Sequence, residues 1–281
     1  MLKQRIITAL LLLAILVPAM VHPNPLGFVA VTGVLIAAAA WEWARLNGLD
    51  HRLALATGLL CAALCFSLWF SDGLQRPIPL VWAALGAFWV LLSGWLLLAG
   101  VTAWVKVPKG VRWLGGIVAL CGAWMALVQA RLVGVNFLFS LLALVWVADI
   151  CAYVSGRLFG GRFIAQKLAP SISPGKTWEG VMGALLGVLG CSYLWRWLES
   201  ANGWPATSLY DHLYLVSPYF LWVALVFLTT MSVVGDLMES LFKRSAGVKD
   251  SSGLLPGHGG VLDRVDALLP VLPLAMLLCT S

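Results

Sequence analysis

Two segments of this sequence concentrate the side chains that can do chemistry. The first covers residues 149–180 and the second residues 236–266, and together they contain seven of the twelve acidic and eight of the eighteen basic residues. Carboxylates hold a hard divalent cation, and neighbouring Lys and Arg side chains attract phosphate oxygens. This combination is what phosphoryl or nucleotidyl transfer needs.

The second segment places its polar residues at helical spacing. Asp236, Ser240 and Lys243 follow an i, i+4, i+7 pattern, with a further glutamate at 239, and Asp263 and Asp266 are three residues apart. Each set is therefore expected to share one helix face. Oxygen ligands without a Cys or His partner favour Mg²⁺ over zinc.

Basic residues lie close to these acids in the sequence. Arg244, Lys249 and Arg264 join Lys243 as candidates for binding phosphate oxygens. His258 stands between glycines and has three interpretations: an acid, a hydrogen-bond donor to phosphate, or a residue that only holds its loop.

The first segment opens with a helical pattern and continues into a loop. Asp149 and Tyr153 share a predicted helix face with Gly156 and Gly160, which suits either a sugar or base ligand or the packing of another helix. The loop at 170–180 contains Ser and Lys side chains between Pro and Gly residues. It makes a plausible phosphate cradle, although the GxxxxGK[ST] spacing of a P-loop is absent.

The composition indicates that these two segments belong to a membrane protein. Of the 281 residues, 61% are hydrophobic and only 11% are charged, with a mean hydropathy of +0.94 and a net charge of +6. A soluble domain carries about 25% charged residues. The composition excludes a soluble enzyme, a disordered chain and a small disulfide scaffold, and it indicates an all-α polytopic membrane protein.

Nine apolar runs between the charged positions predict nine transmembrane helices. The runs are Ile6–Val21, Leu26–Trp41, Leu53–Phe70, Pro77–Val105, Trp113–Ala130, Leu132–Ala148, Val181–Trp195, Leu213–Gly235 and Ala267–Ser281. With the N-terminus inside, fifteen of the eighteen Lys and Arg residues fall in cytoplasmic segments, as the positive-inside rule requires. We therefore expect a cytoplasmic N-terminus, an outer C-terminus, about six spans in residues 1–148 and a catalytic region in 149–281.

The second segment closely resembles the signature of the phosphatidate cytidylyltransferase (CDP-diacylglycerol synthase) family. The matching run reads Ser240-x₂-Lys243-Arg244-x₄-Lys249-Asp250-x₅-Pro256-x-His258-Gly259-Gly260-x₂-Asp263-Arg264-x-Asp266. The SPGKTWEG stretch at 173–180 and the DICAYVSGRLFG stretch at 149–160 are also similar to that family. Together these motifs cover a little under half of the chain.

The resemblance implies a reaction, its cofactors and its setting. CTP and phosphatidic acid give CDP-diacylglycerol and pyrophosphate, with Mg²⁺, at the cytoplasmic face of a bacterial inner membrane. The metal-binding carboxylates map onto Asp236 and Asp263. A monovalent cation such as K⁺ and a homodimer are further implications, and no nucleic acid partner is expected.

The remaining roles follow from charge and position. Asp266 is expected beside the Mg²⁺ site or on another cation, Lys243 and Arg244 on phosphates, and Lys176 with the Ser173 loop on CTP or the lipid phosphate. We assign six other residues to substrate binding: Tyr153, Ser240, Lys249, Asp250, His258 and Arg264. The lipid tails would stay among the membrane lipids.

Three other classes compete with this interpretation. A CDP-alcohol phosphotransferase would need a DGxxAR motif followed by Asp residues four apart, which this sequence lacks. A transporter of anionic lipids predicts charges near the middle of its spans and inverted repeats. Another membrane-embedded lipid-phosphate nucleotidyltransferase would share the same chemistry, and the residues do not separate it.

Overall fold

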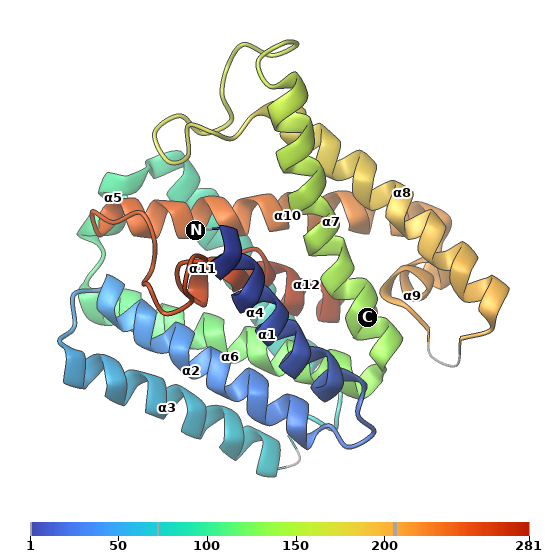
Figure 1. The fold of residues 1–281 in the computed structure, drawn as a ribbon, viewed down its shortest axis with the longest axis horizontal. Coiled ribbons are helices and arrows are strands. Elements are labelled where there is room, and N and C mark those ends of the chain that lie inside the picture. The colour runs from blue at the N-terminus through green and yellow to red at the C-terminus, as the bar shows by residue number, and fades with distance from the viewer. Residues whose placement is uncertain (1, 72, 205–206, 281) are drawn as a thin grey trace.

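The computed structural model describes residues 2–71, 73–204 and 207–280, and all of its regular elements are helices (Figure 1). They are α1 (Leu2–Val21), α2 (Leu26–Leu46), α3 (His51–Phe70), α4 (Pro79–Ala99), α5 (Val101–Lys106), α6 (Lys109–Val133), α7 (Val135–Phe159), α8 (Trp178–Asn202), α9 (Leu209–Val216), α10 (Pro218–Ser245), α11 (Leu262–Val265) and α12 (Leu268–Thr280). The described residues form no strand beyond two isolated β-bridges in loops. The all-α prediction is confirmed.

Seven helices are long and apolar enough to cross a membrane. They are α2, α3, α4, α6, α7, α8 and α10, with 20 to 28 residues each. A residue in an α-helix rises about 1.5 Å, so these lengths suit a hydrocarbon core of about 30 Å. Large apolar side chains remain exposed along them, as helices that face lipid require. The chain is therefore a multi-pass membrane protein.

The first and last predicted spans, α1 and α12, are not among these seven helices. The apolar part of α1 is Ile6–Val21, and α12 has 13 residues. α12 packs against α4, α6 and α10, and its residues from 269 to 276 are all buried. Its continuous apolar sequence thus reflects burial in protein on all sides, which a hydropathy pattern does not separate from exposure to lipid.

The fourth predicted run, Pro77–Val105, is two helices instead of one. Gly100 separates α4 from α5 and has φ +78°, a left-handed conformation that favours glycine. The run therefore contains one candidate membrane span, α4, followed by a short helix, where the sequence predicts one helix throughout. α5 therefore leaves the axis of α4 and packs against α10.

Small residues bring α7 and α8 into close contact along their lengths. A Cβ atom on Gly183 would collide with Ser155, and one on Gly187 would collide with Cys151. Gly190 on the same helix faces open space instead. This pair of helices carries the loop of residues 160–177, which projects at the top of Figure 1.

Candidate active site

The two polar segments meet around one cavity of about 710 Å³. α7, the 160–177 loop, the start of α8, α10 and the segment from 250 to 266 all contribute to its wall. Its ionisable lining residues are Asp149, Arg157, Lys176, Asp236, Glu239, Lys243, Asp250, Asp263, Arg264 and Asp266, together with the phenol of Tyr153. The cavity therefore combines six carboxylates with four cationic side chains, as a site for polyanions and a divalent cation requires.

Three carboxylates form a compact cluster within this cavity. Oxygen atoms of Asp236, Glu239 and Asp266 all lie within 4.8 Å of one another. Asp236 and Glu239 are three residues apart on α10 and share a face. Glu239 is buried, and its Oε1 accepts no hydrogen bond from the described residues. An all-oxygen donor set with an unpartnered buried oxygen fits a hard divalent cation such as Mg²⁺.

The pKa of Asp266 is shifted by its position within this cluster. Burial, together with the charge of Asp236, raises the pKa of Asp266 to about 7. Carboxylates that share a site repel each other, so one of them holds a proton until a cation arrives.

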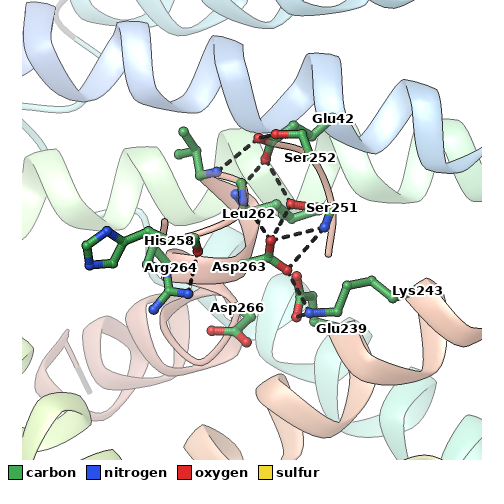
Figure 2. Close-up of polar contacts among 12 residues, drawn as sticks. Glu42, Glu239, Lys243, Ser251, Ser252, His258, Leu262, Asp263, Arg264 and Asp266 are labelled. Atoms are coloured by element: carbon green, nitrogen blue, oxygen red, sulfur yellow. Dashed lines mark hydrogen bonds and ion pairs between the residues drawn. The ribbon is translucent and has the colours of Figure 1, made fainter. Parts of the chain in front are cut away.

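Lys243 links this cluster to Asp263. Its Nζ lies 2.5 Å from Oε2 of Glu239 and 2.6 Å from Oδ1 of Asp263 (Figure 2). Asp263 also accepts hydrogen bonds from the backbone N–H groups of Ser251 (3.0 Å) and Gly260 (2.7 Å). Burial by itself would raise the pKa of Asp263, but its contacts with Glu239, Lys243 and Gly260 outweigh burial and hold that pKa well below its ordinary value.

Glu42 of α2 fixes the same loop from the opposite side. Its carboxylate, fully buried, accepts hydrogen bonds from the backbone N–H groups of Val261 (3.0 Å) and Leu262 (2.7 Å), and from the hydroxyls of Ser251 (3.3 Å) and Ser252 (2.5 Å). Figure 2 shows this carboxylate and that of Asp263 on either side of Ser251. The loop that presents Asp263 is therefore ordered by an acid from the N-terminal half of the chain.

Gly259 and Gly260 have separate reasons to be glycine. Gly259 adopts φ +86°, in the left-handed region. A Cβ atom on Gly260 would collide with the Ser251 hydroxyl and with the Glu42 carboxylate. The glycine pair thus allows two carboxylates to approach one loop.

The 160–177 loop brings Lys176 to the cavity. Lys176 Nζ lies 2.6 Å from Oδ2 of Asp236. The Thr177 hydroxyl caps α8 by accepting a hydrogen bond from the Gly180 N–H at 3.2 Å. Glu179, in the first turn of α8, accepts from the N–H groups of residues 161, 163 and 164 at 3.0–3.1 Å. The loop is therefore tied to α8 at both of its ends.

The structure divides the predicted site residues into two groups. Eight line the cavity: Tyr153, Lys176, Asp236, Lys243, Asp250, Asp263, Arg264 and Asp266. Five do not: Ser173, Ser240, Arg244, Lys249 and His258. Arg244 and Lys249 are exposed, while the His258 carbonyl accepts a 2.6 Å hydrogen bond from Arg264.

Four cavity or loop residues are absent from the predicted set. Asp149 and Arg157 lie on the α7 face already noted for Tyr153, to whose hydroxyl Arg157 donates at 2.8 Å. Glu239 lies alongside the predicted α10 face. Glu42 had one available signal, a lone acid within an apolar run, which is costly in a membrane unless it has partners.

The segment from 149 to 160 both packs against the start of α8 and lines the polar cavity. Gly156 and Gly160 pack against Thr177, as contact between helices predicts. Asp149 and Tyr153 instead face the cavity. Gly156 also lines the cavity, so this face of α7 serves both helix packing and the cavity wall.

Clustered carboxylates and cations around one cavity of a multi-pass helical membrane protein suit an enzyme that handles phosphate groups at a membrane. The chain belongs to the cytidylyltransferase family, whose sequence model matches residues 3–281. It is 38% identical to a phosphatidate cytidylyltransferase of Pseudomonas aeruginosa, over 97% of this chain and 95% of the relative. It is 33% identical to one of Haemophilus influenzae, over 97% and 96%.

Proposed function

We propose that this enzyme transfers the cytidylyl group of CTP to phosphatidic acid, giving CDP-diacylglycerol and pyrophosphate for phospholipid synthesis. The observation that carries the proposal is the cavity in which clustered carboxylates face Lys and Arg side chains. Relatives of nearly the same length, with the name phosphatidate cytidylyltransferase, support the choice of substrates.

The reaction joins two polyanions, so charge neutralisation and positioning are the main tasks of the protein. A phosphate oxygen of phosphatidic acid forms a bond to the α-phosphorus of CTP, and the bond from that phosphorus to the bridging oxygen breaks as pyrophosphate leaves. The second ionisation of a phosphate monoester has a pKa near 6. The attacking oxygen is therefore already ionised at neutral pH and requires no general base.

The cluster of Asp236, Glu239 and Asp266 would hold Mg²⁺, and Asp263, which the resemblance also assigns to the metal, faces the same cavity. Bound there, Mg²⁺ neutralises charge on the triphosphate. Lys243 keeps Asp263 oriented and offers a cation to phosphate oxygens. Lys176, whose Nζ lies 2.6 Å from Asp236, offers a second cation to phosphate oxygens.

Other parts of the expected machinery remain proposals. Ser240, Arg244, Lys249 and His258 would reach substrate only through a rearrangement of their segment. Ser173 shapes the Lys176 loop, since its carbonyl accepts from the Lys176 N–H at 3.2 Å. A K⁺ ion beside Mg²⁺ and a homodimer also belong to this proposal.

The orientation in the membrane is proposed from charge. Nine membrane-embedded helices, a cytoplasmic N-terminus and an outer C-terminus place the cavity at the cytoplasmic side of a bacterial inner membrane, because fifteen of eighteen basic residues then face the cytoplasm. Residues 1–148 would be the N-terminal spans and 149–281 the catalytic region.

The direct test is incubation of the purified protein with radiolabelled CTP, phosphatidic acid and Mg²⁺. We expect label in a lipid product and release of one pyrophosphate for each labelled lipid. Parallel reactions with ATP, GTP and UTP separate a cytidylyltransferase from another lipid nucleotidyltransferase. No labelled lipid with any nucleotide would refute the proposal.

A further inference from the structure

A second cavity, of about 280 Å³, adjoins the carboxylate cluster. Residues of α2, α4, α5, α6, α10, α11 and α12 line it, and its aromatic wall residues are Trp43, Phe88, Trp89, Trp95, Trp104 and Phe242. Glu239 is the single ionisable residue among those that line it. Trp43, Trp104 and Phe242 pack together, with ring centroids 4.6–6.1 Å apart, and form a rigid side of this cavity.

The apolar cavity and the polar cavity share a wall on α10. Glu239 lines both of them. Gly235 lines the apolar cavity, and the next residue, Asp236, lines the polar one. The same turn of α10 thus lines a cavity suited to charged phosphates and a cavity suited to hydrocarbon.

A second hollow adjoins the apolar cavity at the surface of α4 and α5. This more open hollow of about 420 Å³ is lined by Trp95 and Val107, and both residues also line the apolar cavity. This hollow lies at the break between α4 and α5, where Gly100 turns the chain. Trp95 is half exposed. The open hollow therefore shares wall residues with the apolar cavity, and the apolar cavity shares Glu239 with the carboxylate cluster.

We infer that the apolar cavity binds one acyl chain of the lipid substrate while the lipid phosphate occupies the polar cavity. The inference rests on the proposed function, because it supplies the tail of that substrate with a site. A water cluster does not suit this space, since its walls provide few polar partners. An apolar cavity of about 150 Å³ holds benzene, so the present volume accepts a segment of an acyl chain.

The arrangement answers a problem that the chemistry raises. The phosphate of the lipid must leave the membrane surface and meet CTP among charged residues, while its tails lose free energy if they enter water. Burial of each methylene group contributes favourably to binding. A hydrocarbon site one helix turn from Asp236 keeps a tail in apolar surroundings during the transfer.

The test narrows the cavity and varies the length of the acyl chains. Gly115 of α6 lines the cavity, and a Cβ atom there meets only Phe88, at 3.8 Å, so Gly115→Leu directs its side chain toward this space. Gly94→Leu is the matched control, since a Cβ on Gly94 has no neighbour within 4 Å and the residue is exposed. Leu92→Trp narrows the same cavity from α4 and replaces Gly115→Leu if that variant does not fold.

Displacing about two methylene groups weakens binding about tenfold. We expect Gly115→Leu to raise the KM for dioleoyl phosphatidic acid about tenfold, with little change for dihexanoyl phosphatidic acid or for CTP. Gly94→Leu should match the wild type with both lipids. An equal effect of Gly115→Leu on both lipids, or none, would overturn the acyl-chain site.

A binding measurement separates this inference from the proposed function. Phosphatidic acid with a diazirine near the end of one chain should crosslink to α4 or α6 in the wild type, and Gly115→Leu should lose that crosslink. Crosslinks confined to the outer faces of other helices would refute the acyl-chain site even if turnover is normal. A wild type that forms no CDP-diacylglycerol would instead refute the proposed function.

Discussion

The backbone N–H of Leu262 donates a 2.7 Å hydrogen bond to the carboxylate of Glu42, which is 220 residues away in the sequence. This bond joins α2 to the loop that presents Asp263. A buried carboxylate that accepts hydrogen bonds from several N–H and O–H groups holds those groups in fixed positions. Glu42 is therefore a positioning residue: it acts on the site through the loop.

We predict that Glu42→Gln disturbs both stability and turnover. The amide keeps one acceptor oxygen but turns an NH₂ group toward donors, so about 2–4 kcal/mol of stability should be lost. Because the loop then no longer fixes Asp263, kcat should fall at least about tenfold. Thermal unfolding in detergent and steady-state kinetics measure the two effects.

Glu199 provides the matched control for Glu42. It is a buried acid at the far end of α8, and it accepts from Asn136 (3.0 Å) and from the N–H (2.8 Å) and hydroxyl (2.6 Å) of Ser208. Glu199→Gln should lower the Tm by a similar amount without changing kcat of the folded enzyme. Normal kcat in folded Glu42→Gln would show that Glu42 has a purely structural role.

Two neighbouring basic residues should respond very differently to substitution. Lys243→Met leaves Glu239 and Asp263 without their shared cation, at a cost of about 3 kcal/mol. It also removes a phosphate contact, so we expect turnover to fall about a hundredfold. Arg244→Met changes an exposed side chain outside the cavity and should stay within about threefold of the wild type. Equal losses in both variants would place Arg244 on substrate as well.

The polar residues of α10 show how far helical spacing predicts which side chains face the site. The sequence pattern assigns Asp236, Ser240 and Lys243 to one face. In the folded protein the cavity-facing stripe of α10 contains Asp236, Glu239 and Lys243, while Ser240 lies off that stripe. Spacing narrows the choice to adjacent positions about 100° apart, and the packing of α10 against α12 and α5 decides between them.

The features that the sequence does not predict depend on contacts between residues far apart in the chain. The segment from 236 to 266 locates the carboxylates and the bend at Gly259, since those are local properties. It contains no information on Glu42, which reaches this loop only after α2 has packed in the fold. The same holds for α12, whose apolar run reads as a lipid-facing span but lies within the helix bundle.

The raised pKa of Asp266 makes Mg²⁺ binding dependent on pH. Burial and the charge of Asp236 raise this pKa to about 7, above the ordinary value near 3.9. The metal-free protein therefore gains stability from protonated Asp266 at low pH, and it loses that contribution as pH rises from about 4 through 7. Mg²⁺ favours the ionised carboxylate, so its binding releases a proton and weakens toward tenfold for each pH unit below 7.

Calorimetry in two buffers of different ionisation enthalpy measures the released proton. Near pH 6.5 we expect Mg²⁺ binding to the wild type to release a substantial fraction of one proton. Asp266→Asn should reduce that release, while Asp211→Asn, in an ion pair with Arg196 away from the cavity, should retain it in full. Undiminished proton release in Asp266→Asn would assign the titrating group elsewhere.

Substitutions of Asp236 and Asp263 should distinguish an effect on metal binding from an effect on loop stability. Either substitution is expected to abolish most turnover. Asp236 is half exposed and contacts Lys176 in the metal-free protein, so Asp236→Asn should leave the Tm within about 2 °C of the wild type. It should raise the Mg²⁺ concentration for half-maximal activity at least about tenfold, because a neutral amide is a weaker ligand. Asp263→Asn replaces a carboxylate that accepts from Ser251 and Gly260, and its Tm should fall by several degrees. An unchanged Mg²⁺ requirement in Asp236→Asn would contradict the role of α10 in holding the cation.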